Sequence, residues 1–358
     1  MSDNSEYPTS SQGGGSIANL SDSLKAQADE LDERVLATLP ANSKVLSVTP
    51  SGASAWVKTV RIECELEDGT FKDYFMKSAT GGTSQRMMQG CFESEGLFYE
   101  YAPENVPKPV ASGNYKTSPE TWFFLAEFCD MLDDVPEPSQ FIPLIANIHQ
   151  ASIGKSPNGK YGFPVPTHLA NIPNDNTWQD TWEVFFTQLM KKMFEHEELA
   201  HGKDDRLEYL KEALYEKVIP RLLRPLETEG RTIQPCLIHS DIWPGNMMLD
   251  VETNKVILFD SCAFWGHNEA DLGTWRAPRY RMGRPFFREY QKAMQISKPQ
   301  EDWDDRNALY ALRYDLLVSA LFPDDRGLEF RDLAMVELER LVAKYREGYD
   351  GYHSTRTA

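Results

Sequence analysis

The spacing of apolar residues changes part-way along the chain, and this change limits the folds that the chain can adopt. Between residues 44 and 128, short runs rich in β-branched and aromatic residues are separated by turn residues, and Asp68-Gly69 is a strong hairpin signal. From Phe141 onward, apolar residues recur at helical spacing. One such set comprises Leu207, Leu210, Leu214 and Val218. We therefore predict an α+β fold of two lobes, in which a small antiparallel β lobe with one helix precedes a larger, mostly helical lobe.

The predicted elements divide the chain into three parts. Residues 1–22 are rich in Ser, Gly, Asn and Asp, and we expect a disordered tail there, including Gly13-Gly14-Gly15, because no strand precedes that run. The N-terminal lobe is expected over residues 23–130 and the C-terminal lobe over 131–358, with the boundary in an acidic, proline-containing link near 127–138. The N-terminal lobe is predicted to contain helices at 24–39 and 84–101 and strands at 44–48, 56–64, 70–77, 108–116 and 121–128.

Composition excludes several classes of protein. The 358 residues include 37 Lys and Arg against 55 Asp and Glu, a net charge of −18, which argues against a nucleic-acid partner. The five cysteines include no C-x-x-C pair, so neither a zinc site nor a disulfide framework is indicated. No apolar window is long enough to span a membrane, and the first residues lack the apolar core of a secretory signal. We expect a cytoplasmic protein without a membrane partner.

One strand-like stretch in the helical half carries chemically active side chains. An apolar run leads into His239-x-Asp241, Asn246 follows five residues after the aspartate, and a second apolar run ends in Asp260. Phosphoryl transfer needs this combination: Asp241 as the catalytic group facing the attacking hydroxyl, and Asn246 and Asp260 as oxygen ligands that hold Mg²⁺ against the phosphates of ATP. The alternative is a tight turn in which Asp241 and Asn246 bond to nearby backbone.

A nucleotide-binding lobe also needs a lysine that reaches the phosphates and a glutamate that steadies it. Lys77 ends an apolar strand, and we expect it to pair with Glu95 on the predicted helix, with Glu93 as the reserve. The alternative is an ordinary surface lysine, because lysine is almost never buried unpaired.

The remaining ATP-binding parts are less clearly marked. The turn at 50–55 contains one glycine and lacks G-x-G-x-x-G, so backbone amides with Ser51, Gly52 and Ser54 are expected to hold the phosphates. The adenine is expected to lie against the strand that joins the lobes, at Glu127, Phe128 and Cys129.

These residues resemble the fructosamine kinase family, the ketosamine and protein-ribulosamine 3-kinases, within the protein-kinase-like superfamily that also holds aminoglycoside and choline kinases. The resemblance covers about residues 43–322. It is carried by Phe92-Glu93-Ser94-Glu95, Tyr161-Gly162-Phe163, Asn176-Thr177-Trp178, Trp182 with Phe185-Phe186, Leu237 to Asn246, Phe259-Asp260 and Ala263 to Leu272. The Asp-x-Trp-x-Gly-Asn and Gly-His-x-Glu-x-Asp-Leu runs are its most specific signals.

The chain departs from the family pattern at three places. Ser240 stands where the family usually has Gly, Ser261-Cys262 where it has Pro-Ala, and the segment 310–317 lacks the usual Asn-His-Trp-Asn. These departures leave the preferred sugar amine open. The phosphate-loop cysteine of some members has no counterpart in residues 50–55, so no redox switch through that loop is expected.

The resemblance implies transfer of the ATP γ-phosphoryl group to the 3-hydroxyl of a ketosamine, either a small molecule or a glycated protein, followed by release of the amine. Trp243 would lie under the sugar ring, and the substrate side would also include His267 and Glu269, which with Asp271 would position the catalytic loop and the metal-bearing strand. The alternatives are core packing for Trp243 and a structural hydrogen-bond network for the other three residues.

Two other functions remain open from the sequence. The same scaffold serves aminoglycoside or choline-type phosphotransferases, and the glycine-poor phosphate turn leaves room for a nucleotide-binding module that has lost activity. The oligomeric state is not predicted.

Overall fold

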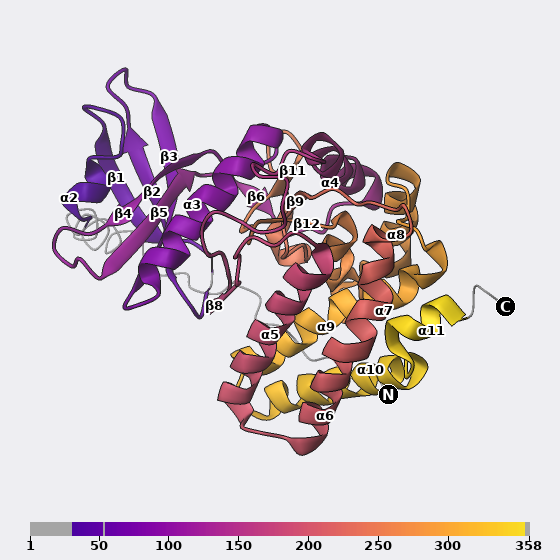
Figure 1. The fold of residues 1–358 in the computed structure, drawn as a ribbon. Coiled ribbons are helices and arrows are strands. Elements are labelled where there is room, and N and C mark those ends of the chain that lie inside the picture. Colours follow the sequence, from indigo (N-terminus) through magenta and orange to yellow (C-terminus); the bar gives the residue numbers. More distant parts are fainter. Residues whose placement is uncertain (1–30, 53, 355–358) are drawn as a thin grey trace, which may run out of the picture.

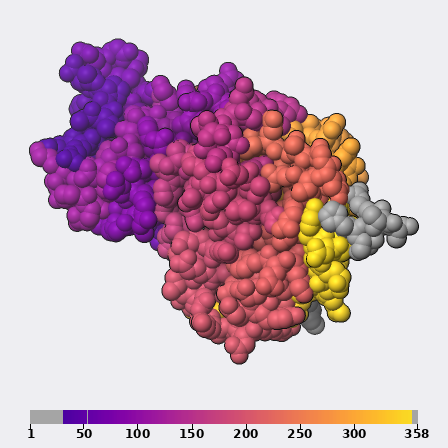
Figure 2. Space-filling model, viewed as in Figure 1, coloured from indigo at the N-terminus to yellow at the C-terminus, as the bar shows by residue number. Residues whose placement is uncertain are grey.

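The computed structural model describes residues 31–52 and 54–354, and it has two lobes of unequal size (Figure 1). Figure 2 shows the smaller, indigo-to-violet lobe projecting from the larger body. The predicted tail at 1–22 lies outside the described residues, as do residues 24–30 of the helix predicted over 24–39. In the described part of that prediction, only α2 (Glu33–Leu36) is α-helical, and the carboxylate of Asp32 caps it by accepting a hydrogen bond from the backbone N–H of Arg34.

The smaller lobe is built on a five-stranded antiparallel sheet with the strand order β1-β2-β3-β5-β4. Its strands are β1 (Lys44–Pro50), β2 (Lys58–Glu65), β3 (Phe71–Thr80), β4 (Pro109–Asn114) and β5 (Thr121–Glu127). The predicted Asp68-Gly69 turn connects β2 to β3, where Lys58 pairs with Ser78 and Glu65 with Phe71. Alternate residues of β2 are buried, as expected for a sheet with one covered face.

Helix α3 (Ser84–Tyr101) has the bounds that the sequence predicted, and it connects the two lobes. Near its start, Met87 and Met88 pack against Phe124 and Ala126 of β5. Near its end, Phe98 belongs to the apolar core of the larger lobe. One helix therefore sets the sheet against the helical body, as Figure 1 shows.

The link between the lobes continues into a second, small sheet. Strand β6 (Met131–Leu132) pairs with β10 (Met247–Asp250), which pairs with β11 (Val256–Leu258). The candidate residues flank this hairpin: Asp241 and Asn246 precede β10, and Asp260 follows β11. The division of the chain at residue 130 stays a prediction.

The larger lobe packs around the buried indole of Trp182, which donates a hydrogen bond of 2.9 Å to the hydroxyl of Tyr310. Its helices are α4 (Pro138–Ser152), α5 (Trp182–His201), α6 (Asp205–Ala213), α7 (Ile219–Leu223), α8 (Gly283–Ala293), α9 (Trp303–Leu321), α10 (Asp325–Lys344) and α11 (Gly348–Ser354). Its other short strands are β7 (His168–Leu169), β8 (Ile172–Pro173), β9 (Cys236–Ile238) and β12 (Phe264–Gly266). A π-helical turn, η1 (Leu214–Val218), separates α6 from α7, and 3₁₀ turns occupy Arg224–Glu227, Pro244–Asn246, Asn268–Leu272, Thr274–Arg276, Pro278–Tyr280 and Gln300–Asp302.

Helix α9 lies inside this lobe, where it packs against α5, α7 and α10. Because the helix is surrounded, it buries polar residues such as Arg306, Asn307 and Arg313 together with its apolar ones. None of the helices in the described part of the chain is both long and apolar enough to cross a membrane.

Candidate active site

The ammonium group of Lys77, on β3 of the smaller lobe, contacts the carboxylate of Asp260 in the larger lobe. Lys77 Nζ lies 2.5 Å from Asp260 Oδ1, although the two residues are 183 positions apart in the sequence. Lys77 is 8% exposed, and its Nζ is 5.4 Å from the ring centroid of Phe124. Burial alone would lower the pKa of Lys77, but the charge of Asp260 raises that pKa well above its usual value. Lys77 is therefore a buried, charged lysine, and the surface alternative is wrong.

Asp260 follows β11 in a left-handed backbone conformation. Its φ is +59°, and the preceding residue accepts a hydrogen bond of 3.1 Å through its carbonyl oxygen from His239 Nε2. The side chain of Asp260 is 54% exposed, so Lys77 covers only part of the carboxylate. The charge of Lys77 lowers the pKa of Asp260, which keeps this carboxylate ionised.

Asp241 lies at the start of the loop between β9 and β10 and is only partly buried. The side-chain amide of Asn246 donates hydrogen bonds to the carboxylate of Asp241 at 2.8 Å and to its backbone carbonyl at 2.9 Å. Burial and the nearby charge of Asp260 raise the pKa of Asp241 to about 7, against the lowering effects of Asn246 and Arg313. The local bonds of the tight-turn alternative are thus present, and the carboxylate also lies within electrostatic reach of Asp260.

The carboxylate of Asp271 binds the backbone of this loop. Its two carboxylate oxygens accept hydrogen bonds from the N–H groups of His239, at 2.9 Å, and Ser240, at 2.5 Å. His149 Nε2 lies 3.0 Å from Asp271 Oδ2 and completes the buried network. Asp271 therefore positions the loop, as the resemblance implies.

The expected ion pair between Lys77 and Glu95 is not formed, and this corrects the prediction. Glu95 is buried, and its Oε1 accepts hydrogen bonds from the backbone N–H of Ser261 at 2.6 Å and from its hydroxyl at 2.8 Å. A proline at position 261 could donate neither hydrogen bond. The serine that stands in place of the family's proline therefore provides the hydrogen-bond partner of Glu95. Burial raises the pKa of Glu95 to about 7, although Ser261 and the charge of Lys77 oppose the shift. The reserve candidate, Glu93, is exposed.

The predicted phosphate turn lies between β1 and β2. The N–H of Ser51 already donates to the carbonyl of Thr59 at 3.2 Å, and the hydroxyl of Ser54 accepts from the N–H of Trp56 at 3.2 Å. Gly52 has a φ of +73° and space around its Cα, which suits a close approach to a ligand.

An aromatic contact that sequence reasoning missed joins this turn to the other lobe. The ring centroids of Trp56 and Phe322 are 6.4 Å apart, and the guanidinium of Arg326 lies 3.7 Å from the Phe322 centroid. No local pattern predicts such a contact, because Phe322 follows α9, far along the chain.

The residues predicted to face adenine have other contacts. Glu127 forms an ion pair of 2.6 Å with Lys72, and the N–H of Phe128 donates to a carbonyl of β3 at 3.0 Å. Together with Cys129 they line a hollow of about 320 Å³ that neither Lys77 nor Asp260 lines. The adenine contacts stay a prediction.

Two residues predicted on the substrate side are buried away from solvent, which corrects that assignment. His267 is 1% exposed, and its ring nitrogens contact the hydroxyls of Tyr310 at 2.9 Å and Ser297 at 2.8 Å. Glu269 is 2% exposed and forms a buried ion pair of 2.9 Å with Arg306. Both residues serve a structural network, the alternative left open by the sequence.

Trp243, the third of these residues, is only partly buried and lies next to the catalytic loop. Its ring centroid is 5.6 Å from that of Tyr280. A Cβ at position 245 would overlap the indole in its present orientation, so the indole of Trp243 lies directly over Gly245. The sugar contact of Trp243 stays a prediction.

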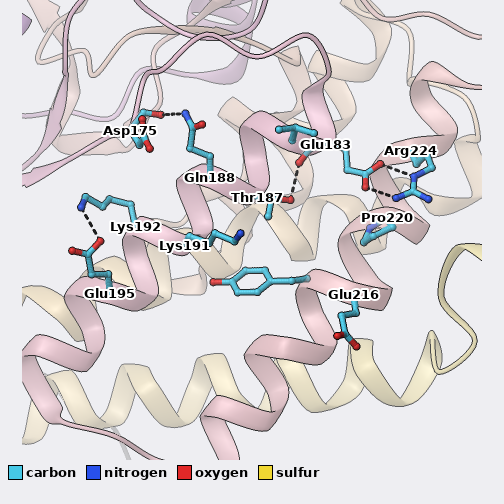
Figure 3. Close-up of a pocket in the computed structure, with 12 residues that line it drawn as sticks. Asp175, Glu183, Thr187, Gln188, Lys191, Lys192, Glu195, Glu216, Pro220 and Arg224 are labelled. Atoms are coloured by element: carbon cyan, nitrogen blue, oxygen red, sulfur yellow. Dashed lines mark hydrogen bonds and ion pairs between the residues drawn. The ribbon is translucent and has the colours of Figure 1, made fainter.

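The larger of the two hollows described in this structure, of about 780 Å³, lies elsewhere, between α5 and the η1 turn (Figure 3). Its walls include Asp175, Lys191 and Glu216, and none of the predicted site residues.

The oxygen atoms at the site suit a magnesium ion bound together with a nucleotide. Asp260 offers a partly exposed carboxylate. The amide nitrogen of Asn246 donates its hydrogen bonds to Asp241, which leaves the amide oxygen available as a metal ligand. No group of three or more His, Cys, Asp or Glu side chains among the described residues forms a metal cage. Mg²⁺ is commonly held by one or two protein oxygens together with phosphates and water, and this donor set fits that mode.

Comparison with known proteins shows the family of this chain. The family model for fructosamine kinase matches residues 54–352. The chain belongs to the fructosamine kinase family. It is 30% identical over 260 residues to a chloroplastic protein-ribulosamine 3-kinase of Arabidopsis thaliana, a match covering 71% of this chain and 72% of that protein. It is 37% identical over 114 residues to a ketosamine-3-kinase of Mus musculus, covering 32% of this chain and 34% of that protein.

Solved structures confirm the predicted kinase-like fold. A Thermobifida fusca structure assigned as a fructosamine-3-kinase has a TM-score of 0.66 at 19% identity and covers 88% of this chain and 99% of that one. Aminoglycoside phosphotransferase APH(4)-Ia, solved with AMP-PNP and hygromycin B, has a TM-score of 0.57 at 14% identity and covers 87% of this chain and 98% of that one.

Proposed function

We propose that this fructosamine kinase family member transfers the γ-phosphoryl group of ATP to the 3-hydroxyl of ketosamines. The observation that carries the proposal is the contact of Lys77 with Asp260 beside the pair formed by Asp241 and Asn246. A buried cation, two carboxylates and an amide from separate elements meet here, as phosphoryl transfer requires.

The side chains have distinct roles in this proposal. Asp241 accepts the proton of the attacking hydroxyl, since its raised pKa makes it a base suited to neutral pH. Lys77 turns from Asp260 toward the nucleotide phosphates, while Glu95 holds the loop that carries Asp260 through its bonds to Ser261. Mg²⁺, held by Asn246 and Asp260, would neutralise phosphate charge.

The nucleotide and the sugar occupy opposite sides of these groups. The phosphate turn, with Ser51, Gly52 and Ser54, covers the phosphates, and Trp243 provides an apolar surface for the sugar ring. The adenine lies against the link at 127–129.

The proposal extends to the acceptor and the cellular setting. Small ketosamines and glycated proteins are both acceptors, and release of the amine after phosphorylation would repair glycated protein. The net charge of −18 suits a cationic sugar amine and disfavours nucleic acid. All five cysteines are free, which supports a reducing compartment, and we propose the cytoplasm.

A panel of acceptors tests the proposal. ATP consumption is compared for fructosyl-lysine, ribulosyl-lysine, choline and kanamycin, with Asp241→Asn as the matched inactive control. Turnover that is highest with a ketosamine and absent in the control is expected. Preference for choline or kanamycin would overturn the acceptor assignment. Stabilisation by Mg²⁺-ATP without turnover of any acceptor would instead favour an inactive binding module.

A further inference from the structure

The residue before Asp241 has an unusual backbone conformation. Ser240 has a φ of +68°, in the left-handed region that L-amino acids with a side chain rarely adopt. The residue is fully buried, between His239 and Asp241 in the candidate catalytic loop. A glycine would adopt this φ without strain, so the serine must be held there by its surroundings.

Three hydrogen bonds hold Ser240, and they differ in what they require. Asp271 accepts from its N–H at 2.5 Å, and the hydroxyl of Tyr314 donates to its carbonyl at 2.8 Å. Both bonds would form equally well with a glycine. The third bond, from Arg313 Nη1 to Ser240 Oγ at 2.8 Å, requires the serine hydroxyl.

Arg313 is an unusual residue in its own right. It lies on α9, is 2% exposed, and forms no ion pair of 4.0 Å or less with any described residue. Its Nη2 donates to Asn174 Oδ1 at 2.6 Å, and its Nε is buried without a hydrogen-bond partner. A buried charge without a paired counter-ion costs stability. The guanidinium lies 5.7 Å from the ring centroid of Phe264 and 5.5 Å from that of Tyr314, and its hydrogen bonds go to Asn174 and to Ser240 of the candidate catalytic loop.

We propose that Arg313 is a positioning residue for phosphoryl transfer: its guanidinium holds the hydroxyl of Ser240 and thereby fixes the backbone that presents Asp241 to the acceptor. Arg313 does not touch the reacting atoms. Its second bond, to Asn174, joins the catalytic loop to the segment that follows β8. The inference rests on the proposed function, because that function makes Asp241 the base.

Kinetic analysis of five variants tests this role. The variants are Ser240→Ala, Ser240→Gly, Arg313→Met, Arg313→Lys and the double variant Ser240→Ala/Arg313→Met. We expect Arg313→Met and Ser240→Ala each to lower kcat by about 10- to 100-fold, since misplacement by about 1 Å costs on the order of 10²-fold. KM for Mg²⁺-ATP should stay within about twofold, because uniform binding is unaffected. Arg313→Lys should recover part of kcat.

Two comparisons separate the hydroxyl bond from other effects. Ser240→Ala keeps the strain but removes the hydroxyl, whereas Ser240→Gly removes both, so Ser240→Gly should lose less kcat than Ser240→Ala. Wild-type kcat in Ser240→Ala would overturn the proposal. The double variant should lose no more than Arg313→Met alone, because both changes break one interaction. Losses that multiply would also overturn it. Arg206→Met, which breaks an exposed ion pair with Glu339, is the matched surface control and should keep wild-type kcat.

A readout that needs no acceptor distinguishes failure of this inference from failure of the proposed function. If wild-type protein phosphorylates no ketosamine, the proposed function fails, and amide hydrogen exchange over residues 237–246 then decides the role of Arg313. Faster exchange there in Arg313→Met and Ser240→Ala than in Arg206→Met supports the inference. Exchange at the wild-type rate in both variants would overturn it.

Discussion

Replacing Glu269 with Gln tests whether this buried carboxylate supports the fold or contacts the substrate. Glu269 Oε2 lies 2.9 Å from Arg306 Nε, and the two side chains are 3% and 0% exposed. Arg306 also donates to the carbonyls of Pro299 at 2.6 Å and Ser297 at 2.8 Å. The amide of Gln keeps the shape of the side chain but removes its charge, which leaves the guanidinium buried without a counter-ion.

The expected loss of stability is large because both partners are desolvated. Breaking a buried ion pair by removing one partner costs about 3–5 kcal/mol. A lobe of this size loses about 2–4 °C in Tm for each kcal/mol, so we expect Glu269→Gln to lower Tm by on the order of 6–20 °C. The matched control is Glu195→Gln, which breaks an exposed pair of 2.7 Å with Lys192 and should cost about 0–1 kcal/mol.

Two measurements separate a structural role of Glu269 from a substrate contact. Thermal unfolding of both variants gives the loss of stability, and acceptor kinetics well below their Tm give KM for the ketosamine. If Glu269 is structural, Tm falls while KM for the ketosamine stays near the wild-type value. A Glu269→Gln protein with wild-type Tm and a raised KM for the ketosamine would refute this reasoning and return Glu269 to the substrate side.

Three further changes test other parts of the structure. Asp241→Asn should lower kcat by about 10²–10⁴-fold while Mg²⁺-ATP still stabilises the protein, and equal turnover would remove Asp241 as the base. Asp260→Asn should abolish most of the stabilisation by Mg²⁺-ATP, which is about 2.7 kcal/mol at a hundredfold excess over Kd; an unchanged thermal shift would contradict its metal role. Burial would raise the pKa of Asp32, but hydrogen bonds from Lys116, Thr117 and Arg34 hold that pKa well below its usual range. The stabilisation that Asp32 provides is therefore present above about pH 4 and is lost as the pH falls through the folded-state pKa. Urea unfolding should therefore show a deficit in Asp32→Asn at pH 7 that shrinks below about pH 4, and a deficit that stays constant to pH 3 would disagree with this account.

The order and type of the larger elements were predictable because they depend on local spacing. The helix at 84–101 was predicted with the bounds of α3, since its sequence contains no proline and carries apolar residues on the faces that pack. The hairpin at Asp68-Gly69 was predicted because the turn residues determine the pairing of β2 with β3. The strands β6, β7 and β8 were missed, because two residues are too few to show a period.

The sequence by itself determined which chemical groups are present and the spacing of Asp241, Asn246 and Asp260, since those groups lie on one short stretch. Only the tertiary structure decided which groups meet. Lys77 contacts Asp260, Glu95 bonds to Ser261, and Glu269 is buried against Arg306 rather than facing a substrate. The physical reason is that spacing along the chain sets the direction of a side chain relative to its own helix or strand, whereas its partner depends on how that element packs against others far away in the sequence.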